Sequence, residues 1–220
     1  STASSSSQAP EPDIEPKGRR RAPVYATVGL ISLKDISPLA MSFEAKVRVY
    51  LLWEVDLSEE TTWAAEAEEQ EDGYFPLSPD MITEFAERID IPTVSFFNLI
   101  SREEADTVGM RIYRRTKPGS PNVVLWNQAW NIKFRQGFWL KEFPFDHHFL
   151  DMQLELDNSR TWNKYHLIVV AVLLNKDAVL LTQFDVHRPF IQREGPRIDH
   201  RRKTVRVHVA RQWQYYLYNI

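Results

Sequence analysis

The feature that most constrains this chain is a long alternation of apolar and polar side chains between Met41 and Glu54. Apolar residues occupy every odd-numbered position of this stretch, and charged or polar residues occupy almost every even-numbered one. Successive side chains of a β-strand point to opposite faces of a sheet, so the pattern predicts one strand with a single buried face. At about 3.3 Å per residue the strand would extend roughly 45 Å, which favours a tall β-sandwich over a compact barrel.

Shorter patterns of the same kind recur along the chain and predict further strands. The clearest are 130–140 and 150–157, in which apolar residues again alternate with polar ones. Other extended segments are expected at 24–33, 107–115, 123–126, 162–174, 178–186 and 204–218. Ser78, Pro79 and Asp80 precede an apolar segment and predict a short capped helix that reaches Ile89. The sequence thus predicts an all-β fold, an immunoglobulin-like β-sandwich of about ten strands with a short helix.

Composition indicates the domain organisation and excludes several classes of site. The chain has 220 residues, of which 43% are apolar, enough for one large sandwich. Residues 1–22 are rich in Ser, Pro and Arg, which predicts a disordered tail, and residues 23–220 are expected to form the folded domain. A net charge of −3 gives no bulk affinity for nucleic acid. The sequence contains no cysteine, which excludes disulfides, thiol catalysis and zinc–thiolate sites.

Catalytic and metal-binding patterns are weak in this sequence. It has no Gly-rich phosphate loop, no nucleophile elbow and no His-Glu helix motif. His147 and His148 are adjacent, and adjacent side chains of a strand point apart instead of sharing one metal. The acidic segment 59–72 is either a Ca²⁺ site or a solvated loop or helix face, and it lacks the spacing and the glycine of a Ca²⁺ loop. We therefore expect no enzyme activity, no catalytic residue, no metal site and no cofactor.

Three short motifs carry a resemblance to a known family. They are a Phe-Pro-Phe-Asp loop at 143–146 between two amphipathic strands, a segment containing Pro92 and Phe97-Asn98, and an Arg followed by aromatic residues at 211–216. In this order and spacing they resemble the extracellular domain of the pentameric ligand-gated ion channels, also called Cys-loop receptors. The resemblance covers about residues 24–220. The chain departs from the family at the two cysteine positions, which fall on Gln136 and Leu150.

The resemblance implies an extracellular ligand-binding domain that forms a homopentamer, with ligand sites between neighbouring copies. Such a domain lies on the extracellular face of the cell membrane and joins a pore region, which here would follow Ile220. The longest apolar run, 167–174, is far shorter than the roughly 20 residues that span a bilayer. Two alternatives stay open, a soluble pentameric ligand-binding protein without a channel and an adhesion or lectin-like sandwich. An apolar run of about 20 residues after Ile220 in the parent gene would distinguish a channel from a soluble binder.

The resemblance also implies which residues line the ligand site. In the family an aromatic box holds a cationic amine by cation–π attraction. Carried over position by position, the box falls on Phe97, Asp157, Phe190, Gln192 and His200 of one copy and on Arg48, Tyr50, Leu125 and Asn127 of the next. Arg48 and Asp157 replace aromatics, so we expect weak binding of quaternary amines and a preference for anionic, zwitterionic or amphiphilic ligands. The alternatives are that Arg48 pairs with Asp157 across the interface without a ligand, and that Phe97 packs in the core.

A second group of residues is implied to couple ligand binding to the pore. It comprises Glu142, Phe143, Pro144, Phe145, Asp146 and Arg211. In the family this loop lies at the membrane end of the domain, and an Arg close to the first membrane helix pairs with nearby acids. Asp146 and Glu142 are the expected partners of Arg211. The alternative is that these residues only brace the end of the domain.

Overall fold

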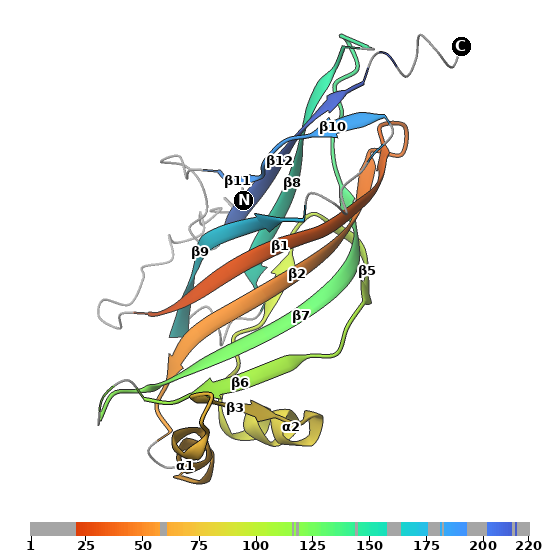
Figure 1. The fold of residues 1–220 in the computed structure, drawn as a ribbon. Coiled ribbons are helices and arrows are strands. Elements are labelled where there is room, and N and C mark those ends of the chain that lie inside the picture. The colour runs from red at the N-terminus through yellow and green to blue at the C-terminus, as the bar shows by residue number, and fades with distance from the viewer. Residues whose placement is uncertain are drawn as a thin grey trace, which may run out of the picture.

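The computed structural model describes residues 21–57, 61–115, 117, 119–143, 145–157, 164–175, 181, 183–192, 202–212 and 214. These residues form two β-sheets that pack face to face, together with two short helices (Figure 1). The predicted all-β sandwich of about ten or more strands is therefore confirmed. Figure 1 places both helices at one end of the sandwich and the described residues between β7 and β8, 136–143 and 145–146, at the opposite end.

The larger sheet has seven strands. They are β1 (Ala22–Ser37), β2 (Ser42–Val55), β3 (Tyr74–Leu77), β5 (Leu99–Glu104), β6 (Gly109–Tyr113), β7 (Asn122–Arg135) and β9 (Tyr165–Leu174). Their order is β3-β6-β7-β2-β1-β9, and β5 pairs with the second half of β7. All pairs are antiparallel except β1 with β9, which are parallel. The first strand of the domain is thus joined to a segment that comes much later in the chain.

The smaller sheet has five strands. They are β4 (Val94–Phe96), β8 (His147–Leu156), β10 (Phe184–Val186), β11 (Phe190–Ile191) and β12 (Arg202–Arg211). Their order is β10-β12-β8-β4, and β11 also pairs with β12. Alternate side chains of β8 and β12 point into the sandwich and are buried, so their remaining side chains form the outer face of this sheet.

The core lies between the two sheets. The predicted alternation is confirmed in β2, whose inward side chains from Phe43 to Trp53 are each at most 1% exposed. Phe134 of β7 stacks on Phe43 with ring centroids 4.8 Å apart, and Phe96 of β4 meets Phe134 edge-on at 5.3 Å. Burial of one such side chain is worth about 1.5–3 kcal/mol, so this layer is the main source of stability.

The predicted capped helix is confirmed as α2 (Pro79–Arg88). Ser78 precedes it, and its hydroxyl accepts a hydrogen bond from the backbone N–H of Met81 at 3.4 Å. This bond satisfies one of the N–H groups that have no partner within the first turn. Pro79 suits the first helical position because its ring sets a helical φ and its missing N–H is not needed there.

A second helix, α1 (Thr61–Glu69), lies within the acidic segment. Trp63 and Ala67 are buried, and the Trp63 ring lies 5.1 Å from the ring of Phe85 in α2. Glu66, Glu68 and Glu69 are exposed, so this part of the acidic segment is a solvated helix face. In the described part of the chain neither helix is long and apolar enough to cross a bilayer.

Several strand boundaries differ from the predicted ones because a strand ends where its neighbours end. The segments predicted at 123–126 and 130–140 belong to one strand, β7, which ends at Arg135. Arg135 pairs with Ser42 at the first residue of β2, and after it the backbone N–H of Gln136 donates to the carbonyl of Met41 in the preceding turn at 2.8 Å, so the strand pairing ends where β2 begins. Met41, predicted on the buried face, lies in the turn before β2 with φ 50° and is 55% exposed. Trp139 and Leu140 have left the sheet and are also exposed.

The last strands are shorter than predicted. β10 covers only the end of the strand expected at 178–186, of which 178–180 and 182 lie outside the described residues. β12 ends at Arg211 instead of Tyr218, because its partners β8 and β10 pair only as far as Ala210 and Arg211. The short strand β11, which follows β10, was not predicted from the sequence.

Candidate functional site

The four residues expected on one side of the ligand site lie together. Tyr50 of β2 pairs directly with Asn127 of β7, and Arg48 is two residues away on the same face of β2. Leu125 is two residues from Asn127 on the same face of β7. All four are half-buried on the outer face of the seven-stranded sheet. The structure therefore groups Arg48, Tyr50, Leu125 and Asn127 on one surface.

Arg48 has a charged partner within its own chain. Its guanidinium pairs with the carboxylate of Asp106, in the loop between β5 and β6. A hydrogen bond with Tyr50 raises the pKa of Arg48, burial opposes this, and the bond to Asp106 adds to the rise. The side chains of Arg48 and Asp106 are 34% and 39% exposed, so the pair faces solvent. Arg48 is a permanent cation whose charge Asp106 already balances. The sequence carried no signal for Asp106, because the two residues are distant along the chain.

Asn127 is held in place by a close approach to Gly109 of β6. Its side-chain amide donates a hydrogen bond to the Gly109 carbonyl at 3.3 Å. A Cβ at position 109 would lie 2.8 Å from Asn127 Nδ2, so only glycine leaves room for this contact without a shift. Asn127 thus presents a fixed side chain to the outer face of the sheet.

The residues expected on the other side of the ligand site lie on the five-stranded sheet. Phe97, in the turn after β4, is 56% exposed and therefore is not a core residue. The guanidinium of Arg202 lies 3.2 Å from the centroid of the Phe97 ring, and Arg202 also pairs with Glu155 at 3.4 Å. One face of the aromatic ring is thus occupied by a cation of the protein itself. Arg202 and Glu155 meet because β12 and β8 pair in that register, which the sequence did not reveal.

Phe190 and Gln192 lie farther along the same sheet. Phe190 of β11 meets Phe149 of β8 edge-on, with ring centroids 6.4 Å apart. The backbone N–H of Gln192 donates to the Thr204 carbonyl at 2.9 Å, which holds this segment against β12. Both residues are therefore on or beside the outer face that carries Phe97.

Asp157 and His200 complete the expected set. Asp157 follows β8 and is exposed, and its backbone N–H donates to the Thr93 carbonyl at 2.9 Å. His200 lies outside the described residues. Because Arg48 pairs with Asp106, the alternative of an Arg48–Asp157 pair between copies would require Arg48 to exchange partners.

The two groups of expected residues lie on opposite sheets. Arg48 and its neighbours point outward from the seven-stranded sheet, whereas Phe97 and Phe190 point outward from the five-stranded sheet. The buried core separates these faces, so one chain cannot bring both groups to one ligand. A combined site requires two copies of the chain, each of which contributes a different face.

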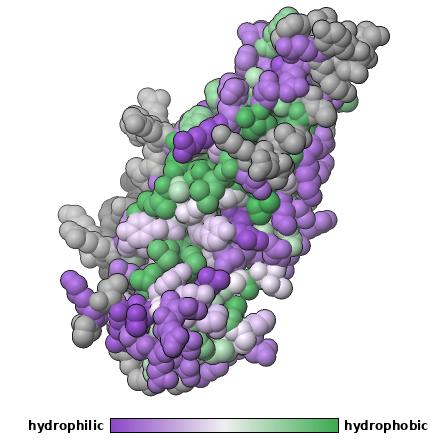
Figure 2. Space-filling model, viewed as in Figure 1, coloured by the Kyte–Doolittle hydropathy of each residue, from purple (hydrophilic) through white to green (hydrophobic). Residues whose placement is uncertain are grey.

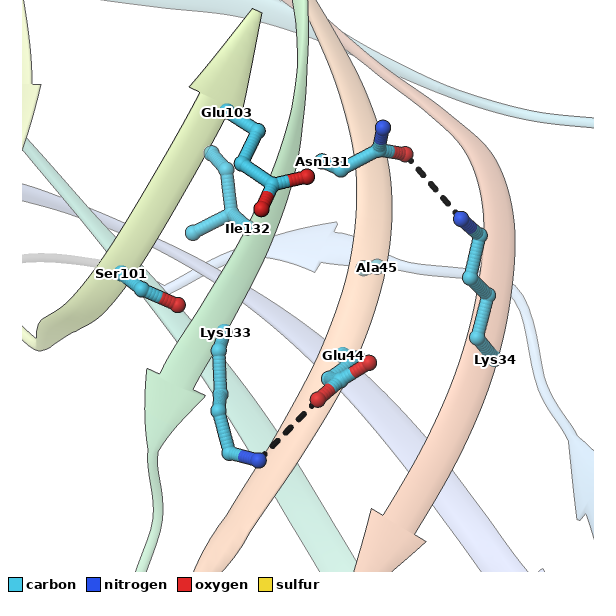
Figure 3. A pocket seen from close by; sticks show the side chains of 8 residues that line it. All are labelled: Lys34, Glu44, Ala45, Ser101, Glu103, Asn131, Ile132 and Lys133. Atoms are coloured by element: carbon cyan, nitrogen blue, oxygen red, sulfur yellow. Dashed lines mark hydrogen bonds and ion pairs between the residues drawn. The ribbon is translucent and has the colours of Figure 1, made fainter. Parts of the chain in front are cut away.

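A small polar cavity of about 120 Å³ lies on the same sheet, nearer the start of β2 than the first group (Figure 3). It is lined from β1, β2, β5 and β7, and Figure 3 shows its charged side chains pointing toward one another. Lys133 Nζ pairs with Glu44 at 3.0 Å, and Lys34 Nζ donates to the amide oxygen of Asn131 at 3.1 Å. Both lysines already have partners within the chain, so an anion would have to displace one of them.

The expected coupling residues surround a buried ion pair. Arg211 Nε and a second guanidinium nitrogen donate to the two carboxylate oxygens of Asp146 at 2.6 and 3.0 Å. Their side chains are only 5% and 1% exposed, and His148 Nε2 also contacts the Asp146 carboxylate. Burial opposes ionisation of Asp146, but the bonds from Arg211 and His148 outweigh it and lower the pKa of this carboxyl. Of the two expected partners of Arg211, Asp146 forms the pair.

Large apolar side chains are exposed around this ion pair. Trp139, Leu140, Phe143 and Phe145 are 67%, 47%, 54% and 60% exposed. The Arg211 guanidinium lies 5.1 Å from the Phe143 ring, which connects the exposed segment to the buried pair. Glu142 is also exposed, and Pro144 lies outside the described residues. Clustered exposed apolar groups are typical of interaction or membrane-facing surfaces.

A second apolar surface lies on the outer face of the seven-stranded sheet. Tyr25 of β1, Leu52 of β2, and Val170 and Leu173 of β9 are 39%, 36%, 54% and 55% exposed. Tyr25 pairs with Leu52, which pairs with Leu125, so this apolar band crosses neighbouring strands. Figure 2 shows hydrophobic residues gathered over this part of the molecule, with hydrophilic residues toward both ends.

No protein-family model matches this chain, and no curated protein matches its sequence. Assignment of a function therefore depends on the residues and their arrangement.

Proposed function

We propose that this chain is the extracellular ligand-binding domain of a pentameric ligand-gated ion channel, with ligand bound between neighbouring copies. The observation that carries the proposal is the division of the expected ligand residues between two outer faces. Arg48 and Asn127 lie on one sheet and Phe97 and Phe190 on the other. In a closed ring each copy offers one face to one neighbour and the other face to the next, so this division is what an interfacial site requires.

The apolar band on the seven-stranded sheet supports assembly. Leu52, Val170 and Leu173 expose large apolar surface beside the Arg48 group. Contact with a neighbouring copy would remove this surface from water, at about 25 cal/mol per Å² buried. The same contact would bring a second chain next to Arg48.

The end of the sandwich that carries residues 136–146 supports a junction with a membrane part. Trp139, Phe143 and Phe145 are exposed there, next to the buried pair of Asp146 and Arg211. Tryptophan favours membrane interfaces because its indole ring combines an apolar body with an N–H donor, and the two Phe rings add apolar surface that could enter the bilayer boundary. Movement of this loop would displace Asp146 and Phe143, which both contact Arg211 of β12.

The charges around the expected site favour an anionic or zwitterionic ligand. Arg202 already occupies a face of the Phe97 ring, which leaves less room there for a quaternary amine. Arg202 is 26% exposed and its distance to Glu155 is 3.4 Å, so its bond to that carboxylate is long. A ligand carboxylate would compete with Glu155 for this guanidinium.

The assembly is tested by native mass spectrometry and electron microscopy of the purified chain. We expect rings of five copies, and the substitution Leu173→Asp should dissociate them while the circular dichroism spectrum stays unchanged. Leu39→Asp is the matched control, because Leu39 is 97% exposed in the β1–β2 turn and lies outside the apolar band. A monomer at all concentrations would contradict the proposal and favour an adhesion or lectin-like module.

Ligand binding and gating are tested separately. A thermal-shift screen should find amino acids or small carboxylates as binders, and Arg202→Gln should weaken them at least about tenfold, because a bond to a charged group is worth about 1.5–3 kcal/mol. Binders restricted to aromatic amines would contradict the assigned ligand chemistry. For gating, residues 1–212 would replace the extracellular domain of a pentameric channel of known structure. Ligand-evoked current in this chimera would support a channel, and ligand binding by rings without current would favour the soluble pentameric binder.

A further inference from the structure

Three histidine rings form a stack on the outer face of the five-stranded sheet. His208 of β12 lies between His187, which follows β10, and His147 of β8. Its ring centroid is 4.5 Å from that of His187 and 5.4 Å from that of His147, with interplanar angles of 17° and 18°. The backbone N–H of His187 donates to the His208 carbonyl at 2.9 Å, which fixes the first pair. We call His147, His187 and His208 the histidine stack.

Among the described residues, the charged groups near the histidine stack form no ion pair with its rings. Phe149 of β8 packs against His208 with ring centroids 5.2 Å apart. The charged groups on the neighbouring positions are Arg206 of β12, Asp151 of β8, Asp185 of β10 and Arg188 of the following loop. Arg206 and Asp151 form a bidentate pair at 2.6 and 2.8 Å, and Asp185 accepts a hydrogen bond from Gln212 at 2.7 Å. Within the described ranges no carboxylate forms an ion pair with any of the three rings.

Neutral imidazole rings can stack, but protonated rings at these distances repel each other. Burial lowers the pKa of His208, and the charges of His187 and His147 lower it further. Because folding lowers the pKa of His208, its neutral ring contributes to the stability of the folded state. This contribution is complete above the pKa of the unfolded state, 6.5, and is lost as the pH falls below that value. Even with the dielectric constant of water, each protonated neighbouring pair disfavours the stacked arrangement roughly four- to fivefold.

The histidine stack adjoins a short strand pairing at the edge of the five-stranded sheet. β10 pairs with β12 through only Phe184, Asp185 and Val186. The Phe184 ring lies 4.7 Å from the Arg211 guanidinium and covers it. β10 therefore connects the two features, because Phe184 covers Arg211 at its start and His187 joins the histidine stack just after its end.

We propose that the histidine stack is a proton-binding site whose protonation releases β10 from β12 and uncovers the Arg211–Asp146 ion pair. At neutral pH the stacked rings and the bond from His187 to His208 hold β10 in place. Once protons bind, the charged rings repel one another, the stack opens, and the three-residue pairing of β10 no longer suffices. The buried ion pair, and with it the exposed aromatic segment at this end, then becomes sensitive to acidity.

Amide hydrogen exchange of the full chain tests the proposal. The amides of His187 and Gln212, which donate across the β10–β12 boundary, are compared at pH 7.5 and pH 5.5 after correction for the intrinsic pH dependence of exchange. In the unaltered protein their protection should fall at least about fourfold on acidification. The amide of Leu51 in β2 should stay protected, which separates local release from global unfolding.

Two substitutions make the test specific. His208→Phe keeps an aromatic ring at the centre of the stack but removes its charge, so the acid-induced loss of protection should disappear. His166→Phe is the control, because His166 is exposed on β9 and far from the stack, and it should leave the loss unchanged. If His208→Phe does not fold at pH 7.5, His208→Gln serves in its place. Unchanged protection in the unaltered protein, or an equal loss in the uncharged variant, would overturn the proposal.

Discussion

Replacement of Asp146 by Asn is the most informative perturbation of this protein. Asn has nearly the same shape as Asp but no charge, so the change removes one partner of a buried ion pair without creating a cavity. Arg211 would then keep its charge with only 5% of its side chain exposed. His148 would also lose the carboxylate that it contacts.

The size of the effect follows from this burial. Removal of one partner of a buried ion pair costs about 3–5 kcal/mol, because the other charge is left without compensation. An exposed pair is worth about 0.2–1 kcal/mol. Arg211 and Asp146 form two hydrogen bonds, at 2.6 and 3.0 Å, and so behave as a buried ion pair and not as an exposed one. We therefore expect Asp146→Asn to lower the free energy of unfolding by about 3–5 kcal/mol.

Urea unfolding at pH 7.5, followed by tryptophan fluorescence, measures this change. With an m-value of about 2 kcal/mol/M the midpoint should fall by about 1.5–2.5 M. Glu44→Gln is the matched control, because its partner Lys133 lies at 3.0 Å but the two side chains are 41% and 35% exposed. Its effect should stay below about 1 kcal/mol.

A double substitution separates lost charge pairing from lost packing. In Asp146→Leu/Arg211→Met both charges are replaced by apolar groups, and replacement of a whole buried pair is often neutral. The double variant should therefore be more stable than Asp146→Asn alone. A loss below about 1 kcal/mol in Asp146→Asn would refute the reasoning, since the pair would then behave like a solvent-exposed one.

Three further outcomes are expected. The free energy of unfolding should fall on acidification below about pH 4, because folding lowers the pKa of Asp146. In a series of urea midpoints measured at different pH, Asp146→Asn should lack the share of this fall that comes from Asp146. Phe134→Ala should cost about 3–5 kcal/mol in the same assay, because Phe134 is fully buried between Phe43 and Phe96; a cost below about 1 kcal/mol would mean that the core collapses around it. Ser78→Ala should cost about 1 kcal/mol through the lost cap of α2, whereas Ser78→Asp should cost little; equal losses for both would argue against the cap.

The sequence identified residues of the candidate site, but it did not identify most of the side chains that contact them. The motif positions named Arg48, Phe97, Asp146 and Arg211, and all four lie on outer faces or at the end of the sandwich. The resemblance also named Asp146 as an expected partner of Arg211, but it did not name Asp106 as the partner of Arg48 or Arg202 as the cation over Phe97. Arg202 covers Phe97 only because β12 pairs with β8 in one register, and a shift of one residue would place its side chain on the opposite face.

The sequence by itself determined the local properties of this protein. The alternation in β2 specified a strand with one buried face, and Ser78-Pro79 specified the start of α2, because both signals depend only on neighbouring residues. Only the tertiary structure decided which strands became neighbours, where β7 ended, which side chains met as the histidine stack, and which of the two expected acids paired with Arg211. The register between distant strands is set by the sum of many contacts across the core, so no short stretch of sequence contains it.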